Sequence, residues 1–547
     1  MIESRANPWA VLTVLCMGFF MVLLDLTIVN IAIPSMIDGL KASLDQVLWV
    51  LNAYTLTYAV LLITAGRLGD RFGQRTLFAV GLAIFTAASA LCGLAQDPTQ
   101  LIGARVLQGL GGALLTPQTL AILTSIFPPE RRGAAFGVWG GIAGLATIAG
   151  PVLGGLIVTY LSWRWVFYVN VPVGIVAFVL TFLIVPDLRP GRVTGIEPVG
   201  VLLTSAGLFA ITFGLIEGER FDWATVTTVA GVPITIASLL VAGAVLMIAF
   251  FVWDSFRTSP LVPLSLFRDR NFSLMNWVAA TVAFGMIGLF LPLTIYLQSA
   301  LGFTALKAGL TLLPMSLVSM PVAPVAGRLA DRIGGKYVLM VGVALFAIGM
   351  GWLDWRAGID STWETFLPGL LVAGVGVGCT FAPMTTVAMR NIRPQMAGAA
   401  SGVLNTTRQV GAAIGSAVVG AVLQNRLAAS LHDQAVSYSA QLPPQVPQVV
   451  RQRFVDGFSN AVKGGLEVGH SSSSSAGQVQ GVPPQVAAQI AEISHDVFAY
   501  GFIGAMRPTL LVPIGVLALG SISCFAIKRR KRAQVSAAET ERPLPAA

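Results

Sequence analysis

The stretch Gly66-Arg67-Leu68-Gly69-Asp70-Arg71-Phe72-Gly73-Gln74-Arg75 decides how this chain folds, because it is a short charged segment between two long apolar runs. It recurs, imperfectly, as Gly327-Arg328-Leu329-Ala330-Asp331-Arg332-Ile333-Gly334-Gly335-Lys336, again between two apolar runs. Self-similarity at a fixed offset indicates a duplicated unit. The offset of 261 residues, from 66 to 327, is too long for a solenoid repeat and fits the two related halves of a membrane transporter.

The composition excludes an ordinary soluble domain. Mean hydropathy is +0.78 and only 11% of the residues are charged, whereas soluble domains carry about 25%. The net charge of +9 comes from basic residues scattered through short loops, which favours membrane topology over a nucleic-acid partner. The four cysteines lie in apolar runs at no recognisable spacing, so we expect no metal site, no disulfide framework and no cofactor.

The apolar runs predict an all-α membrane protein with 14 spans, since each run approaches the ~20 residues that cross a bilayer. Their approximate positions are 9–33, 47–66, 76–95, 100–123, 134–158, 164–186, 198–216, 228–252, 273–297, 306–327, 336–354, 365–386, 402–423 and 507–527. An even number puts both termini on one side. The loops on that side hold 21 lysines and arginines and the short loops opposite hold 5, so we expect both termini in the cytoplasm of a bacterial cell.

The repeated segment divides the chain into units. If it marks the same point in each half, residues 1–186 form one six-helix half and 273–547 the other, with an inserted helix pair at 187–252 and a cytoplasmic linker at 253–272. The linker is basic and amphipathic, as a helix lying on the membrane surface would be. A long extracellular loop is expected at 424–506, with helices over Val446–Leu466 and Gln485–Tyr500 around a serine run that is either a flexible tip or a disordered insertion.

The charged segments have the chemistry of a cytoplasmic latch. Asp70 can face the positive N-terminus of a neighbouring helix, and the basic side chains beside it can pair with it or with anionic headgroups. Charges that only set topology are the alternative, but an aspartate in the same position of both segments disfavours it. The residues assigned to this latch are Arg67, Asp70, Arg71, Arg75, Asp331 and Arg332.

Several further stretches show a resemblance to a known family. They are Leu24–Pro34 in the first span, Leu101 to Gly112 in the fourth, Gly150–Gly155 in the fifth and Trp163–Pro172 at the sixth. With the charged segments, they resemble the major facilitator superfamily, and within it the 14-span drug:proton antiporters. The resemblance implies a fold of two six-helix bundles plus an inserted pair, a monomer, and the exchange of protons for lipophilic small molecules.

Two embedded charges are candidates for proton coupling. Asp25 is the one carboxylate well inside an apolar run, and burying it costs several kcal/mol unless it is neutralised, paired or facing water. Arg105 lies at a similar depth, within ~5 Å along the membrane normal at 1.5 Å per residue, so the two side chains should sense each other. The resemblance implies a proton-coupling role for Arg105. Structural hydrogen bonds are the alternative for both residues, and Arg408 is a weaker case of the same kind.

The remaining candidates concern the path of the substrate. Gly150, Pro151, Gly154 and Gly155 predict a closely packed, kinked hinge in the fifth span, which the resemblance links to export. Glu217 and its neighbours 219, 220 and 222 are expected to be solvated loop charges. A substrate cavity is predicted from polar and aromatic residues of the spans: Asn30, Tyr54, Gln108, Phe290, Tyr296, Gln298, Asn405 and Arg408.

The chain shows no phosphate-binding loop and no catalytic constellation, so an enzyme is the poorest fit. A proton-driven exporter of lipophilic drugs or antibiotics, cationic ones included, is the main prediction. The alternatives are a lipid or glycolipid exporter that uses the external loop to hand over its cargo, and a membrane sensor that transports nothing. Protons and membrane lipids are the other expected partners.

Overall fold

The fold was analysed in a computed structural model, which describes residues 7–187, 197–218, 220–221, 223–229, 232–442, 448–461 and 484–528. Thirteen helices within these residues are long and apolar enough to cross a membrane. The remaining predicted span, 134–158, lies within the 29-residue helix α6. The prediction of an all-helical membrane protein is therefore confirmed, apart from one short hairpin.

The N-terminal half contains six long helices, two of which are joined directly by the first charged segment. Its elements are α1 (Pro8–Ile31), α2 (Ile33–Leu40), α3 (Leu44–Phe72), α4 (Gln74–Leu94), α5 (Pro98–Ile126), α6 (Arg132–Tyr160), α7 (Trp165–Tyr168) and α8 (Asn170–Ile184). Gly73 separates α3 from α4 with φ of 98°, a conformation that side chains other than glycine rarely adopt. The turn in the charged segment thus depends on this glycine.

The C-terminal half repeats this plan, with Gly334 at φ 84° between its second and third long helices. Its elements are α12 (Arg270–Ile295), the π-helix η1 (Tyr296–Ala300), α13 (Ala305–Ile333), α14 (Gly335–Arg356), α15 (Trp363–Ala388), the 3₁₀ turn η2 (Pro394–Met396), α16 (Ala397–Ser439), α17 (Gln448–Ala461), α19 (Pro484–Ser523) and the 3₁₀ turn η4 (Cys524–Ala526). The two halves meet where α6 packs on α13 and α15, and where α16 packs on α3 and α5.

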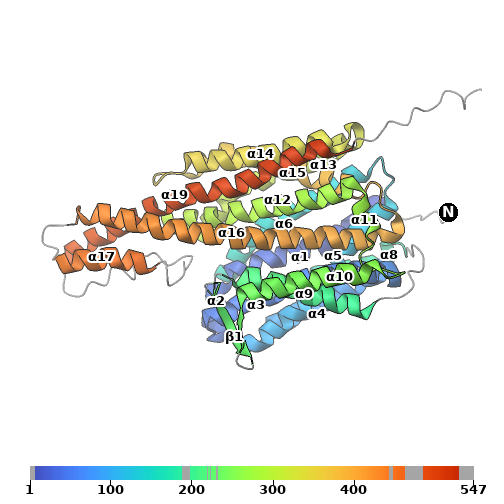
Figure 1. The fold of residues 1–547 in the computed structure, drawn as a ribbon, viewed down its shortest axis with the longest axis horizontal. Helices are drawn as coiled ribbons and strands as arrows, with labels where there is room; N and C mark the ends of the chain where they lie inside the picture. The colour runs from blue at the N-terminus through green and yellow to red at the C-terminus, as the bar shows by residue number, and fades with distance from the viewer. Residues whose placement is uncertain are drawn as a thin grey trace, which may run out of the picture.

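The inserted pair consists of α9 (Pro198–Glu217) and α10 (Ile236–Ser255), joined by an antiparallel hairpin of β1 (Thr225–Val229) and β2 (Val232–Thr235). In Figure 1 the pair lies along the outside of the bundle, and α9 contacts both α3 and α16. We call the end of the bundle with the two charged segments the charged-loop face, and the opposite end the hairpin face.

The linker differs from the predicted surface helix, because it contains only the single turn α11 (Ser265–Arg268). The carboxylate of Asp254 accepts hydrogen bonds from the backbone N–H groups of Leu261 (2.7 Å) and Val262 (3.0 Å). Pro260 and Pro263 flank these two residues and lack an N–H, and the side chains of Leu261 and Val262 are buried in the resulting loop.

The predicted long loop 424–506 is mostly helical where it is described. Helix α16 continues 16 residues past its predicted end at 423, and α19 begins 23 residues before its predicted start at 507. Helix α17 lies within the range of the first expected helix, whereas the second is the beginning of α19 rather than a separate element. Their external location stays a prediction. These three helices extend beyond the hairpin face as a projection, at the left of Figure 1. The serine run lies outside the described residues.

Candidate functional site

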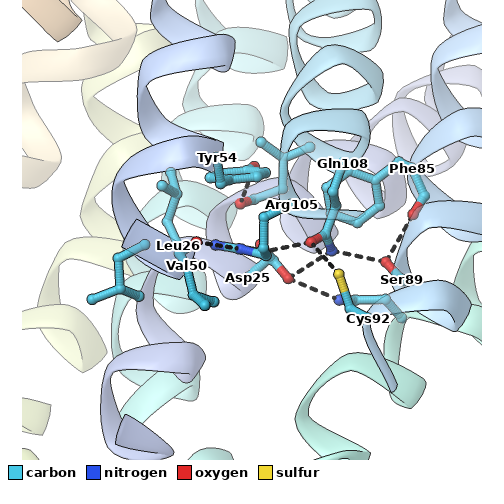
Figure 2. A network of polar contacts seen from close by, with 12 residues as sticks. Asp25, Leu26, Val50, Tyr54, Phe85, Ser89, Cys92, Arg105 and Gln108 are labelled. Atoms are coloured by element: carbon cyan, nitrogen blue, oxygen red, sulfur yellow. Dashed lines mark hydrogen bonds and ion pairs between the residues drawn. The ribbon is translucent and has the colours of Figure 1, made fainter. Parts of the chain in front are cut away.

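Asp25 is at the centre of a buried polar network inside the N-terminal half, and none of its surface is exposed. It lies on α1, and Arg105 and Gln108, one turn apart on α5, both point at it. Arg105 Nη1 forms an ion pair with Asp25 Oδ2, and Gln108 Nε2 donates to Asp25 Oδ1 at 2.8 Å (Figure 2). The predicted proximity of Asp25 and Arg105 is confirmed; their role in proton coupling stays a prediction.

Arg105 is fixed on every side. Its Nε donates to the carbonyl of Val50 at 3.0 Å, and its Nη1 also donates to Gln108 Oε1 at 2.7 Å. The guanidinium carbon lies 4.3 Å from the centre of the Tyr54 ring, a cation–π contact that is visible in Figure 2. Gln108 is held in turn by Ser89, whose Oγ accepts from Nε2 at 2.8 Å. Because Arg105 is fixed by these contacts, its ion pair also fixes the position of the Asp25 carboxylate.

Asn170 completes the network, although it was not among the predicted site residues. It is the first residue of α8, 1% exposed, and its Nδ2 donates to Asp25 Oδ1 at 3.3 Å. Within the described residues its Oδ1 accepts no hydrogen bond. Ser89 was missed as well. The signal available in the sequence was a polar residue inside an apolar run, which is weak because many such residues only bond to their own helix.

The two charged segments make equivalent contacts across the boundary between the halves. Asp70, on α3, accepts from the N–H groups of Gly398 and Ala399 at 2.9 Å each, at the start of α16. We call this contact the first latch. Asp331, on α13, accepts from the N–H groups of Gly133 (2.9 Å) and Ala134 (3.2 Å), at the start of α6. We call this the second latch. Each aspartate thus caps the positive end of a helix of the other half.

Glycine allows this close approach at both latches. A Cβ added to Gly66 would lie 2.3 Å from the carbonyl oxygen of Gly398, and one added to Gly327 would lie 1.9 Å from that of Gly133. These are backbone atoms, which cannot turn aside as a side chain could. The first glycine of each charged segment therefore brings the backbones of the two halves together beside the capping aspartate.

The basic residues of the segments have different surroundings. Arg67 is buried within electrostatic range of Asp70 and Asp254, so the end of the inserted pair reaches the first latch. Arg71 and Arg332 are exposed. Arg75 contacts its own half instead, where its Nη2 donates to the carbonyl of Phe182 on α8 at 2.9 Å.

In α6, two glycines of the predicted hinge, Gly150 and Gly154, pack against α1. A Cβ at Gly150 would lie 2.0 Å from Thr27 Oγ1, and one at Gly154 would lie 3.0 Å from the carbonyl oxygen of Ile28. Gly155 has open space around it, with one atom of Leu306 at 4.0 Å. The side chain of Pro151 lies outside the described part of the chain. Close packing of this helix is thus established, and its role as a hinge stays a prediction.

The predicted cavity residues do not form one group. Tyr54 and Gln108 belong to the Asp25 network, and Tyr296 is tied to the backbone of Gly358 by its hydroxyl, which donates to the carbonyl oxygen at 2.6 Å. Asn405 is buried and bonded to Ser401 of its own helix. The other four keep some exposed surface: Asn30, Phe290, Gln298 and Arg408.

The expectation of a solvated charge is wrong for Glu217, which is 2% exposed. Its Oε1 accepts from Asn52 Nδ2 on α3 at 2.6 Å, and its Oε2 pairs with Arg220 at 2.8 Å. The sequence placed it at the end of a span, where water is the default neighbour, but α9 packs on α3 and buries it. Residues 219 and 222 lie outside the described residues.

This geometry agrees with comparisons with known proteins. The model of the Major Facilitator Superfamily matches residues 15–416, and the chain belongs to this family. It is 40% identical to an uncharacterized MFS-type transporter of Mycobacterium tuberculosis, over 83% of this chain and 78% of that one. It is also 36% identical to the tetracenomycin C resistance and export protein of Streptomyces glaucescens, over 99% of this chain and 95% of that one.

The fold has solved counterparts too. The human organic anion transporter MFSD10 superposes with a TM-score of 0.58 over 94% of this chain and all of that one, at 12% identity. At this identity the likeness concerns the fold alone. Together, the family match and the fold define a multi-pass membrane transporter of two six-helix bundles with an inserted helix pair.

Proposed function

We propose that this chain exports lipophilic drugs or antibiotics across the bacterial cytoplasmic membrane in exchange for protons, by alternating access. The observation that carries the proposal is the buried network around Asp25. An intramembrane carboxylate bonded to an arginine marks a proton or substrate path by default. When Asp25 takes up a proton its ion pair with Arg105 is lost, so the network has two electrostatic states that a transport cycle can use.

Two observations support the proposal, and the first of them concerns export in particular. A relative that aligns with 99% of this chain is named a resistance and export protein. The closure of the charged-loop face by both latches leaves this face shut in one state, as alternating access requires. With 21 basic residues on the side of that face against 5 in the short loops opposite, we assign it and both termini to the cytoplasm.

The test is substrate-induced proton release from liposomes that contain the purified protein, screened with lipophilic drugs, neutral antibiotics and lipids. Release with at least one drug is expected, and Asp25→Asn should abolish it because the amide cannot carry the proton. Asp38→Asn is the matched control, since Asp38 is an exposed aspartate on the neighbouring helix α2. If Asp25→Asn still drives a drug uphill against a proton gradient, the assignment of Asp25 is wrong.

The helical projection suggests a second candidate function, which is the export of lipids or glycolipids. Helices α16, α17 and α19 pack together beyond the hairpin face, where a cargo that never enters water could be handed on. Replacing residues 443–484 by a short Gly/Ser linker separates the candidates. Drug export should continue after this change, whereas transfer of a labelled lipid that depends on the projection should stop.

A further inference from the structure

Arg408 is a second arginine inside the membrane, and its surroundings differ from those of Arg105. It lies on α16, where the six residues before Thr407 are all buried, yet it keeps exposed surface. Its guanidinium carbon is 4.9 Å from the ring centre of Phe381 on α15. Tyr58 of α3, 4% exposed, is within electrostatic range of it. Arg408 therefore lies at the boundary between the halves and is only partly covered by protein.

Arg408 has no counter-ion among the described residues. It donates no hydrogen bond and forms no ion pair there, and its guanidinium contacts the ring of Phe381. Arg105, in contrast, is neutralised by Asp25. An unpaired cation within a bundle is costly, and arginine is the side chain best suited to binding a carboxylate or another planar anion. An anionic ligand would supply the charge that Arg408 lacks among the described residues.

A stack of aromatic rings joins this arginine to the proton network. The Tyr54 ring lies against Arg105 on one side and is stacked with the Tyr58 ring at 6.0 Å and 5°. Both tyrosines are on α3, one turn apart, and Tyr58 donates its hydroxyl hydrogen to Thr116 Oγ1 at 3.3 Å. A change in the position of Arg105 when Asp25 is protonated would move Tyr54, and through it the surface that faces Arg408.

We infer that Arg408 binds the negatively charged group of the transported compound, so that the substrates are lipophilic acids rather than cations. Phe381 and Tyr58 supply aromatic surface beside the charge, and the Tyr54–Tyr58 stack connects substrate binding to the Asp25–Arg105 pair. This inference rests on the proposed exporter function and names its substrate class. It runs against the expectation from the sequence, which included cationic drugs.

The first experiment measures binding to the full-length protein in lipid nanodiscs. The probes are a panel of aromatic carboxylic acids, each paired with its methyl ester, and the tetraphenylphosphonium cation. Acids should bind at least about tenfold more tightly than their esters, because a charge-assisted bidentate contact is lost in the ester. Arg408→Gln should remove this preference, and Arg408→Lys should keep part of it. The control is Arg426→Gln, an exposed arginine farther along the same helix.

Three results would overturn the inference: esters or tetraphenylphosphonium binding as tightly as the acids, a preference for acids that persists in Arg408→Gln, or binding of no acid at all. The connection to the proton network has its own readout. Tyr54→Leu should bind the acids yet release few protons on binding them, and Tyr160→Leu, at an exposed tyrosine outside the network, is the control. Equal proton release from Tyr54→Leu would contradict the connection.

These outcomes are distinct from a failure of the proposed function. If the chain is not a proton-coupled exporter, no substrate releases protons from the parent protein, or Asp25→Asn leaves that release unchanged, whatever the charge of the substrate. If the chain is an exporter but the inference is wrong, proton release still depends on Asp25 while Arg408→Gln transports acids, esters and cations as the parent protein does.

Discussion

At the scale of single residues, the site depends on how many hydrogen bonds each polar atom near Asp25 makes. Gln108 has both ends of its amide bonded, to Asp25 and Ser89 on one side and to Arg105 on the other. Asn170 uses its Nδ2 and leaves its Oδ1 without a donor in the described part of the chain. A protonated Asp25 has a hydroxyl to donate, and after a flip of the amide Asn170 can accept it. We therefore expect Asn170 to stabilise both states of the carboxyl group.

Asn170→Leu should accordingly weaken the coupling of substrate transport to protons without blocking the path of the substrate. The variant loses a hydrogen bond to a charged group, worth about 1.5–3 kcal/mol, so we expect a roughly tenfold or larger drop in substrate-driven proton release. Downhill flux of the substrate should persist. Asn170→Gln, which keeps an amide, should recover part of the release. An unchanged pH dependence of transport in Asn170→Leu would show that the residue serves packing alone.

The glycines at the latches give a second prediction at this scale. Gly66→Ala and Gly327→Ala each place a methyl group against a backbone carbonyl of the other half, so the charged-loop face should close poorly and transport should fall at least about tenfold. The control is Gly103→Ala on α5, where an added Cβ meets nothing within 4 Å. Transport rates in vesicles measure the effect, and normal activity in both latch variants would contradict it.

At the scale of elements, the inserted helix pair is bound to the transport machinery at both ends. Glu217, at the end of α9, is joined to Asn52 on α3, and Asp254, at the end of α10, lies within range of Arg67 on the same helix α3. Since α3 also carries Asp70, the pair contacts one helix near both faces of the membrane. We expect α9 and α10 to move with the N-terminal half.

A double-mutant cycle tests the Glu217–Asn52 connection. Glu217→Gln and Asn52→Leu should each lower the thermal unfolding midpoint, and the combined variant should lose less than the sum, with a coupling of about 0.5–3 kcal/mol. Asp38→Asn, an exposed aspartate on α2, has no part in this contact and should add independently. Strict additivity of Glu217→Gln and Asn52→Leu would mean that the hydrogen bond contributes nothing.

Much of this element plan was predictable from the sequence, for identifiable reasons. The spans follow from apolar runs, and the depth of Asp25 and Arg105 follows from a fixed rise per residue, so their pairing could be anticipated. The helix ends in the projection could not be predicted, because polar residues such as those after 423 end an apolar run without ending the helix. Glu217 was misjudged since burial of a span's end depends on which helix packs there. The contact of Asn170 with Asp25 depends on tertiary packing that no local pattern records.

At the scale of the whole molecule, the two latches are reciprocal. The N-terminal half gives an aspartate to the C-terminal half and receives one from it. If the halves separate as rigid bodies, both latches must break in the same event, and their contributions to the free energy of opening add.

This argument predicts the behaviour of latch variants. In inside-out vesicles, labelling of a cysteine introduced at the buried Ser401, near the first latch, should rise about tenfold in Asp70→Asn and in Asp331→Asn, and multiplicatively in the double variant. The same variants without Ser401→Cys provide the background. If either single variant already labels as fast as the double variant, the latches open separately and the concerted scheme fails.

Because α16 runs without a break from the membrane into the projection, a small tilt of the C-terminal half produces a large displacement at the outer end of this helix. The helix has 43 residues and is therefore about 65 Å long. A tilt of the C-terminal half by ~10° would swing the outer tip through roughly 11 Å, far more than any side chain inside the bundle moves. A pair of dyes, one at the tip and one on the hairpin face, would thus follow each such tilt, and an antibody that clamps the tip should slow any transport that depends on the tilt.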